Sequence, residues 1–102
     1  MNSTICQAIR EMKLLHFTYA DAQGNVHTRL VEPYVHGLTK QGNEALRGYQ
    51  VWGPSETTIP GWKLFLVERM AVLRMVDENF HGTAPGYAHG DKARSPLHCR
   101  VP

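Results

Sequence analysis

The sequence predicts a mainly β domain: an N-terminal helix, followed by four or five short antiparallel strands that curl into a small barrel. Apolar residues recur at helical spacing only near the N-terminus, whereas later segments alternate apolar and polar residues, as half-buried strands do. The chain has 102 residues, 42% of them hydrophobic, which suffices for one domain with one modest core. With so few strands, closing a barrel is the usual way to bury one face and remove free edges.

The helix is expected within the first dozen residues. Thr4 and Gln7 have the spacing of a capping box, in which the two side chains satisfy free N–H groups of the first turn. An apolar stripe follows at helical spacing: Ile5, Ala8, Ile9 and Met12. A helix this short is marginal alone, so we expect it to pack on the strands.

Strands are expected at residues 15–19, 26–31, 45–52 and 62–67, and 70–76 fits either a fifth strand or a helical turn. Residues 21–25 form a turn, and Pro33 ends regular pairing or marks an edge. The strand at 62–67 is apolar on both faces, which predicts burial on both sides. Leu64→Asp is therefore expected to be strongly destabilising.

Charge divides the chain into a near-neutral part and a basic end. The net charge is only +2. Residues 81–102 carry Lys92, Arg94 and Arg100 against Asp91 alone, so this end supplies the excess. The expected organisation is a folded domain over residues 1–80 and a basic C-terminal tail over residues 81–102.

Composition also bears on location and redox state. The chain has no run of about 20 apolar residues to cross a membrane and does not open with a secretory signal pattern, so it is expected to be cytoplasmic. Cys6 and Cys99 are its two cysteines, too few for a small secreted scaffold. Two reduced thiols are the preferred interpretation.

The sequence offers little support for an enzyme. The serines lack a nucleophile-elbow signature, and the glycines match no phosphate-binding loop. The six histidines lack the close spacing of a structural zinc site and are expected at the surface or rim. We therefore expect no catalytic residues, no metal and no cofactor. A small hydrolase that uses histidine and Asp91 is the remaining enzymatic alternative.

Arginines and aromatic residues are interleaved on the predicted strands. The arginines are Arg29, Arg47 and Arg69, and the rings beside them are Tyr19, Tyr49 and Trp62. Arg47 and Tyr49 are two residues apart and share a sheet face. Guanidinium groups beside exposed rings suit a phosphate-bearing ligand whose bases can stack. In the alternative, Arg29 pairs with Glu32 or Glu68 on a solvated face and the rings belong to the core.

The order of these features resembles the WYL domain family. The similarity covers about residues 4–80 and rests on these residues and segments: Ala8-Ile9, then Leu15, Phe17 and Tyr19, then Gly24, Arg29, Val31 and Pro33, then 62–70, and Phe80. The segment 62–70 is similar to the family's "FRLDRI" strand. Where the family has Trp-Tyr-Leu, this chain has Gly48-Tyr49-Gln50, so only the tyrosine matches.

The resemblance implies an Sm-like, SH3-type β-barrel preceded by a helix. It also implies a ligand-sensing module of bacterial transcription or defence regulators, with nucleic acid or nucleotides as ligands. By position it indicates Tyr19, Arg29, Tyr49 and Arg69 as ligand-binding residues, to which face and neighbourhood add Arg47. His27 and His36 are weaker additions on the same grounds.

Two functions are therefore expected. The first is a binding module whose basic, aromatic face accepts nucleic acid or a nucleotide, with its guanidinium groups converging on one concave patch. The alternative is a protein–protein interaction or self-association module without a small ligand. The chain has no room for a helix-turn-helix domain beside the barrel, so it would act free-standing, as a homodimer or docked on a regulatory protein.

Overall fold

A computed structural model describes residues 2–54, 58–87 and 97–102. Its elements, in chain order, are α1 (Asn2–Glu11), β1 (Lys13–Ala20), β2 (Val26–Leu38), β3 (Glu44–Trp52), β4 (Gly61–Leu66), the 3-10 turn η1 (Val67–Arg69), β5 (Met70–Asn79) and β6 (Leu97–Arg100). The prediction of a mainly β fold behind an N-terminal helix is confirmed. The ambiguous segment at 70–76 belongs to a strand, β5.

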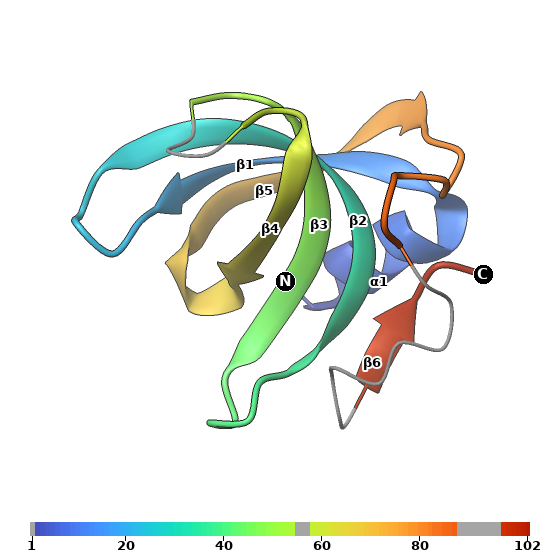
Figure 1. Ribbon diagram of the computed structural model, residues 1–102. Helices are drawn as coiled ribbons and strands as arrows, with labels where there is room; N and C mark the ends of the chain where they lie inside the picture. The colour runs from blue at the N-terminus through green and yellow to red at the C-terminus, as the bar shows by residue number, and fades with distance from the viewer. Residues whose placement is uncertain (1, 55–57, 88–96) are drawn as a thin grey trace.

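The strands form one curved antiparallel sheet in the order β4-β3-β2-β1-β5, with β6 paired to β2 (Figure 1). Within the described residues, hydrogen-bonded pairing does not join β4 to β5, so the sheet is not closed into a barrel. The predicted four or five strands become six, because β6 comes from the segment expected to be a tail.

Helix α1 packs its predicted apolar stripe into the core. Ile5, Ala8 and Ile9 are fully buried. The capping box is wrong, because the helix begins at Asn2 and Thr4 already lies inside its first turn. The helix ends before Met12, whose backbone has a φ of 55°.

The β1–β2 hairpin follows the sequence closely. The Asp21 carboxylate accepts backbone N–H bonds from Gln23 and Asn25, each 2.9 Å long, and these bonds fix the turn. Gly24 has a φ of 86°, a conformation in which glycine is favoured. Register then places Phe17 opposite Arg29 and Leu15 opposite Val31.

Strand β2 continues past Pro33 instead of ending near it. Its pairing with β1 stops at Val31, and its pairing with β6 starts at Val35. At Pro33 the strand is therefore paired only with β3, opposite Gly48, and its register shifts before Val35. A residue without an N–H group is tolerated here because one side of the strand has no partner.

Strands β3 and β4 divide their side chains between the two faces of the sheet. Leu46 lies opposite Phe65 on the buried inner face, and Arg47 lies opposite Leu64 on the outer face. Leu64 is 46% exposed. The predicted burial of both faces is therefore wrong, and the reason for expecting a strong effect of Leu64→Asp is removed.

The described parts of the C-terminal region, residues 80–87 and 97–102, belong to the fold. Residues 80–87 pack on the outer face, where Tyr34 contacts the rings of Phe80 and Tyr87. Strand β6 lies beside α1 (Figure 1), and the Val101 N–H donates to the Tyr34 carbonyl over 2.9 Å. The folded part therefore extends beyond residue 80. Lys92, Arg94 and Asp91, on which the basic tail was predicted, lie outside the described residues.

The expectation of two reduced thiols is also wrong, because Cys6 and Cys99 form a disulfide between α1 and β6. Their sequence separation of 93 hides this pairing from any analysis of local spacing. His36 lies beside the disulfide and is fully buried, so a surface position is wrong for this histidine. Among the described residues, no helix has both the length and the apolar content to cross a membrane.

Candidate anion-binding site

A cationic cluster lies on the inner face of the sheet, at the end where Tyr19 closes the core. Arg29 on β2 lies opposite Phe17 on β1, so the two side chains share the inner face, and Arg29 is only 7% exposed. Its guanidinium carbon lies 5.6 Å from the centroid of the Tyr19 ring. The structure thus brings together two of the predicted ligand-binding residues, Tyr19 and Arg29, in the cation–π arrangement.

Gln50 holds the Arg29 side chain in place. Its Oε1 atom accepts a 3.1 Å bond from the Arg29 guanidinium. Its Nε2 atom donates to the backbone carbonyls of Trp52 (3.2 Å) and Gly53 (3.1 Å), which orients the amide. Gln50 stands where the WYL tripeptide has leucine. A leucine at this position could not accept a hydrogen bond, so the glutamine gives Arg29 a partner that the family's leucine would not provide.

Lys63 is a second cation on the same face. It lies opposite Gly48 in the β3–β4 register, two residues before Phe65 and on that residue's face. Burial, and then the positive charge of Arg29, lower the pKa of Lys63 below its ordinary value. A lowered lysine pKa is the expected result when an ammonium group is taken out of water beside another cation.

Both cations have buried donors without a hydrogen-bond partner among the described residues. These donors are Arg29 Nε and Lys63 Nζ. The salt bridge found in the described part of the chain joins Lys13 to Asp77 and so involves neither Arg29 nor Lys63. Among the described residues Arg29 forms no ion pair with Glu32 or Glu68 and bonds to Gln50 instead. The other part of that alternative is confirmed for Tyr19, which belongs to the core. Uncompensated buried cations are costly for a structure and favour an anion.

The other predicted arginines do not join this cluster. Arg47 and Tyr49 share the outer face, as the sequence predicts, but this is the opposite face from Arg29. The Arg47 guanidinium carbon lies 5.4 Å from the Trp62 ring centroid. Tyr49 contacts the edge of Trp62, with ring centroids 5.3 Å apart, so it packs within the protein.

Arg69 lies on neither face of the sheet but at the end of strand β1. Its guanidinium donates to the backbone carbonyls of Ala20 (3.4 Å) and Asp21 (3.0 Å), at the end of β1. This bonding anchors η1 against the β1–β2 hairpin. The five predicted site residues therefore do not converge on one concave patch; they occupy two faces of the sheet and one strand end.

Two hollows differ in the charge that they offer to a ligand. One, of about 250 Å³, is lined among the described residues by Arg47, Trp62, Lys63 and Leu64, two of them cationic and none acidic. It gives a ligand a route to Lys63 along β4, the edge strand of the sheet.

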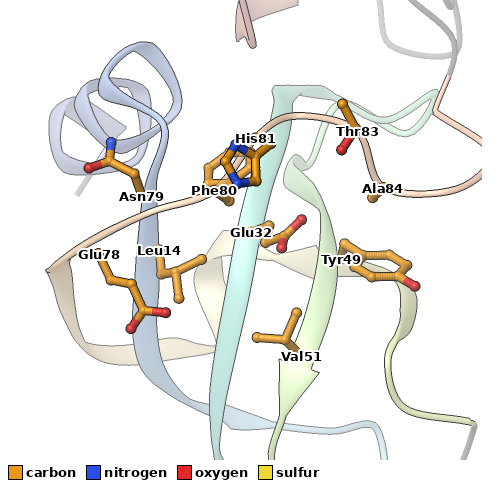
Figure 2. A pocket seen from close by; sticks show the side chains of 10 residues that line it. All are labelled: Leu14, Glu32, Tyr49, Val51, Glu78, Asn79, Phe80, His81, Thr83 and Ala84. Carbon is orange, nitrogen blue, oxygen red and sulfur yellow. The ribbon is translucent and has the colours of Figure 1, made fainter.

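The second hollow, of about 320 Å³, lies on the outer face under the residue 78–84 segment (Figure 2). Glu32 and Glu78 point into it, together with His81. Burial raises the pKa of Glu32, and the 3.1 Å bond donated by the Tyr34 hydroxyl opposes that rise. Two carboxylates make this hollow unsuitable for a phosphate, although it is the larger of the two.

Sequence reasoning missed Gln50 and Lys63. A signal for both exists: each is a polar residue at an inward position of a strand whose flanking inward residues are apolar. The signal is incomplete in one sequence, because the inward face of β4 depends on its register with β3.

Comparison with known proteins supports the fold. The sequence profile of the WYL domain matches residues 1–75. No curated protein matches the sequence. Among solved structures, the fold is similar to proteasome accessory factor B/C (PafBC) of Arthrobacter aurescens, with a TM-score of 0.70 and 20% sequence identity. The match covers 87% of this chain and 13% of that chain, so the similarity concerns one part of a much longer protein.

Proposed function

Since the chain belongs to the WYL domain family, we propose that it is a ligand-sensing regulatory domain that binds a phosphate-bearing ligand, nucleic acid or a nucleotide, at Arg29 and Lys63. One observation carries the proposal: Arg29 Nε and Lys63 Nζ are buried donors without partners in the described chain. A phosphate offers several acceptor oxygens and a compensating charge in one group.

Base stacking would supply the rest of the affinity. A charge-assisted hydrogen bond contributes about 1.5–3 kcal/mol net, whereas micromolar binding requires about 8 kcal/mol. Trp62 lines the hollow next to Lys63, where Tyr87 stacks on its ring and the Arg47 guanidinium carbon lies 5.4 Å from the ring centroid. A base that stacks on Trp62 has to displace one of these groups, and a stacked base adds about 1–3 kcal/mol. Two cations and one stacked base therefore approach micromolar affinity. The likeness to PafBC rests on fold alone, and a role in transcriptional or defence regulation is part of the proposal.

Fluorescence anisotropy with labelled short single-stranded DNA, RNA and ATP, at two salt concentrations, tests this function. We expect salt-sensitive binding to at least one probe. Lys63→Gln should weaken that binding by roughly 10- to 100-fold, the effect of one lost charge-assisted bond. Lys63 is preferred to Arg29 as the test position, because truncating Arg29 would leave the buried Gln50 Oε1 without a donor and destabilise the fold.

Arg74→Gln is the matched control. Arg74 lies exposed on β5, so losing its charge should change affinity by no more than about two-fold. Absence of salt-sensitive binding to every probe would refute the proposed function. An equal loss for Lys63→Gln and Arg74→Gln would show general charge attraction and would refute the site.

A further inference from the structure

Three metal-ligating side chains from distant parts of the chain meet under helix α1. Cys6 comes from α1, His36 from β2 and Cys99 from β6. His36 and Cys99 are partners in the β2–β6 register, and the Cys6 Sγ atom lies 3.6 Å from His36 Nδ1. The two sulfur atoms and a ring nitrogen of His36 all lie within 4.8 Å of one another.

The surroundings hold this cluster rigidly. Cys6, His36 and Cys99 are 9%, 0% and 7% exposed, respectively. Ile5 and Val35, the chain neighbours of Cys6 and His36, belong to the same core, as does Ile9 one helical turn after Cys6. Packing of this kind keeps the three side chains close to one another when the disulfide is opened.

The spacing fits a tetrahedral ion. Zinc–sulfur bonds of about 2.3 Å and zinc–nitrogen bonds of about 2.0–2.1 Å place neighbouring ligand atoms roughly 3.5–3.8 Å apart. The Cys6–His36 distance already has this value. Only the two sulfur atoms, now bonded to each other, would have to separate.

We propose that reduction of the Cys6–Cys99 disulfide turns this cluster into a Cys2His site for a thiophilic cation, with zinc as its occupant. Reduction by a dithiol breaks the S–S bond and delivers two electrons and two protons, giving two thiols while the dithiol becomes a disulfide. The cation then displaces the two thiol protons, and His36 Nδ1 supplies the third ligand. A solvent molecule fills the fourth position, as in zinc sites with three protein ligands.

The two states hold the same elements together. The disulfide links α1 to β6 directly, whereas the metal would link α1, β2 and β6 through one ion. The sequence conceals the site, since its ligands are 30 and 63 residues apart. The inference is independent of the anion proposal, because none of its residues contacts Arg29 or Lys63 in the described structure.

Titration of the full chain with Co²⁺, which reports thiolate ligation by a charge-transfer band, tests the proposal. The protein is first reduced with a phosphine, which becomes the phosphine oxide by taking oxygen from water and leaves no competing thiol. We expect the band to saturate at about one Co²⁺ per chain, and added Zn²⁺ to abolish it. The disulfide form should show no band.

Variants assign the ligands. Cys6→Ser and Cys99→Ser should each abolish the saturating band, and His36→Asn should shift the band and weaken binding by at least ten-fold. His27→Asn, on the exposed part of β2, is the matched control and should leave both unchanged. If the reduced wild-type chain gives no saturating band, the proposal is wrong whether or not the variants fold. A band that persists in both cysteine variants, or is identical in His36→Asn, also overturns it.

Discussion

Burying the Glu32 side chain lowers the stability of this fold by an amount that depends on pH. Burial is the main cause that raises the pKa of its carboxyl group. The folded chain therefore holds the Glu32 proton more tightly than the unfolded chain does. This contribution to stability is complete below the ordinary carboxyl pKa of about 4.3 and is lost as the pH rises through the raised value.

Glu32→Gln should therefore stabilise the protein at pH 7 and have less effect at pH 4. Glutamine keeps an Oε1 acceptor for the Tyr34 hydroxyl and removes the charge that burial penalises. The measurement is the free energy of unfolding in urea at the two pH values. Glu78→Gln is the control, since Glu78 lines the same hollow but is exposed. An equal gain at both pH values for Glu32→Gln would contradict the prediction.

Residue-scale chemistry was the hardest part to anticipate. Arg29, Tyr19 and Arg47 were identified from residue type and strand position, and the shared face of Arg47 and Tyr49 follows from strand periodicity. The separation of Arg29 from Arg47 does not, because it depends on the cross-strand register that places Val31 opposite Gln50 and Glu32 opposite Tyr49. The partners of Arg29 and Lys63 likewise depend on cross-strand register, which one sequence does not display.

At the scale of elements, the close approach of β2 and β3 depends on Gly48. A Cβ atom at this position would lie 2.3 Å from Val31 Cγ1 and 3.2 Å from the Glu32 carbonyl oxygen. Val31 is fully buried and β-branched, so it has little freedom to move aside. Gly48→Ala should lower the free energy of unfolding by about 1–3 kcal/mol, the usual effect of overpacking.

A double-mutant cycle isolates this contact. Val31→Ala removes the clashing methyl group, so Gly48→Ala should destabilise the Val31→Ala protein much less than the wild type. Urea unfolding of the four proteins provides the comparison. Strictly additive effects would show that the Val31 contact is not the reason for glycine at this position. The steric requirement also explains why the family's tryptophan has no place here.

Elements with a strong local pattern were predicted well. The helical stripe, the β1–β2 hairpin and the strands over 45–52 and 62–67 all appear close to their expected residues. The errors have non-local causes: β2 passes Pro33 because β6, more than 60 residues later, pairs with its second half. Thr4 is not the cap because the helix already begins at Asn2, two residues earlier.

At the scale of the whole molecule, one covalent bond joins the beginning of the fold to its end. Cys6 and Cys99 close a loop with a sequence separation of 93. Restricting the unfolded chain in this way stabilises a protein by about 4–5 kcal/mol for a loop of that length. Reduction should therefore lower the free energy of unfolding by about this amount, measured in urea with a phosphine and a metal chelator present.

A Cys6→Ser/Cys99→Ser protein is the control for this measurement. It should unfold at the same urea concentration with and without the phosphine, at or below the midpoint of the reduced wild type. If the reductant leaves the wild-type midpoint unchanged although both thiols are titrated as free, the disulfide does not stabilise the fold.

Strand β2 shares its backbone between two environments. Before Pro33 it lies between β1 and β3 and carries Arg29; after Pro33 it lies between β3 and β6 and carries His36. The two halves have different neighbours on one side, so loosening the C-terminal strand exposes amides in the second half alone. Amide hydrogen exchange along β2 would then show two different levels of protection, one before Pro33 and one after it.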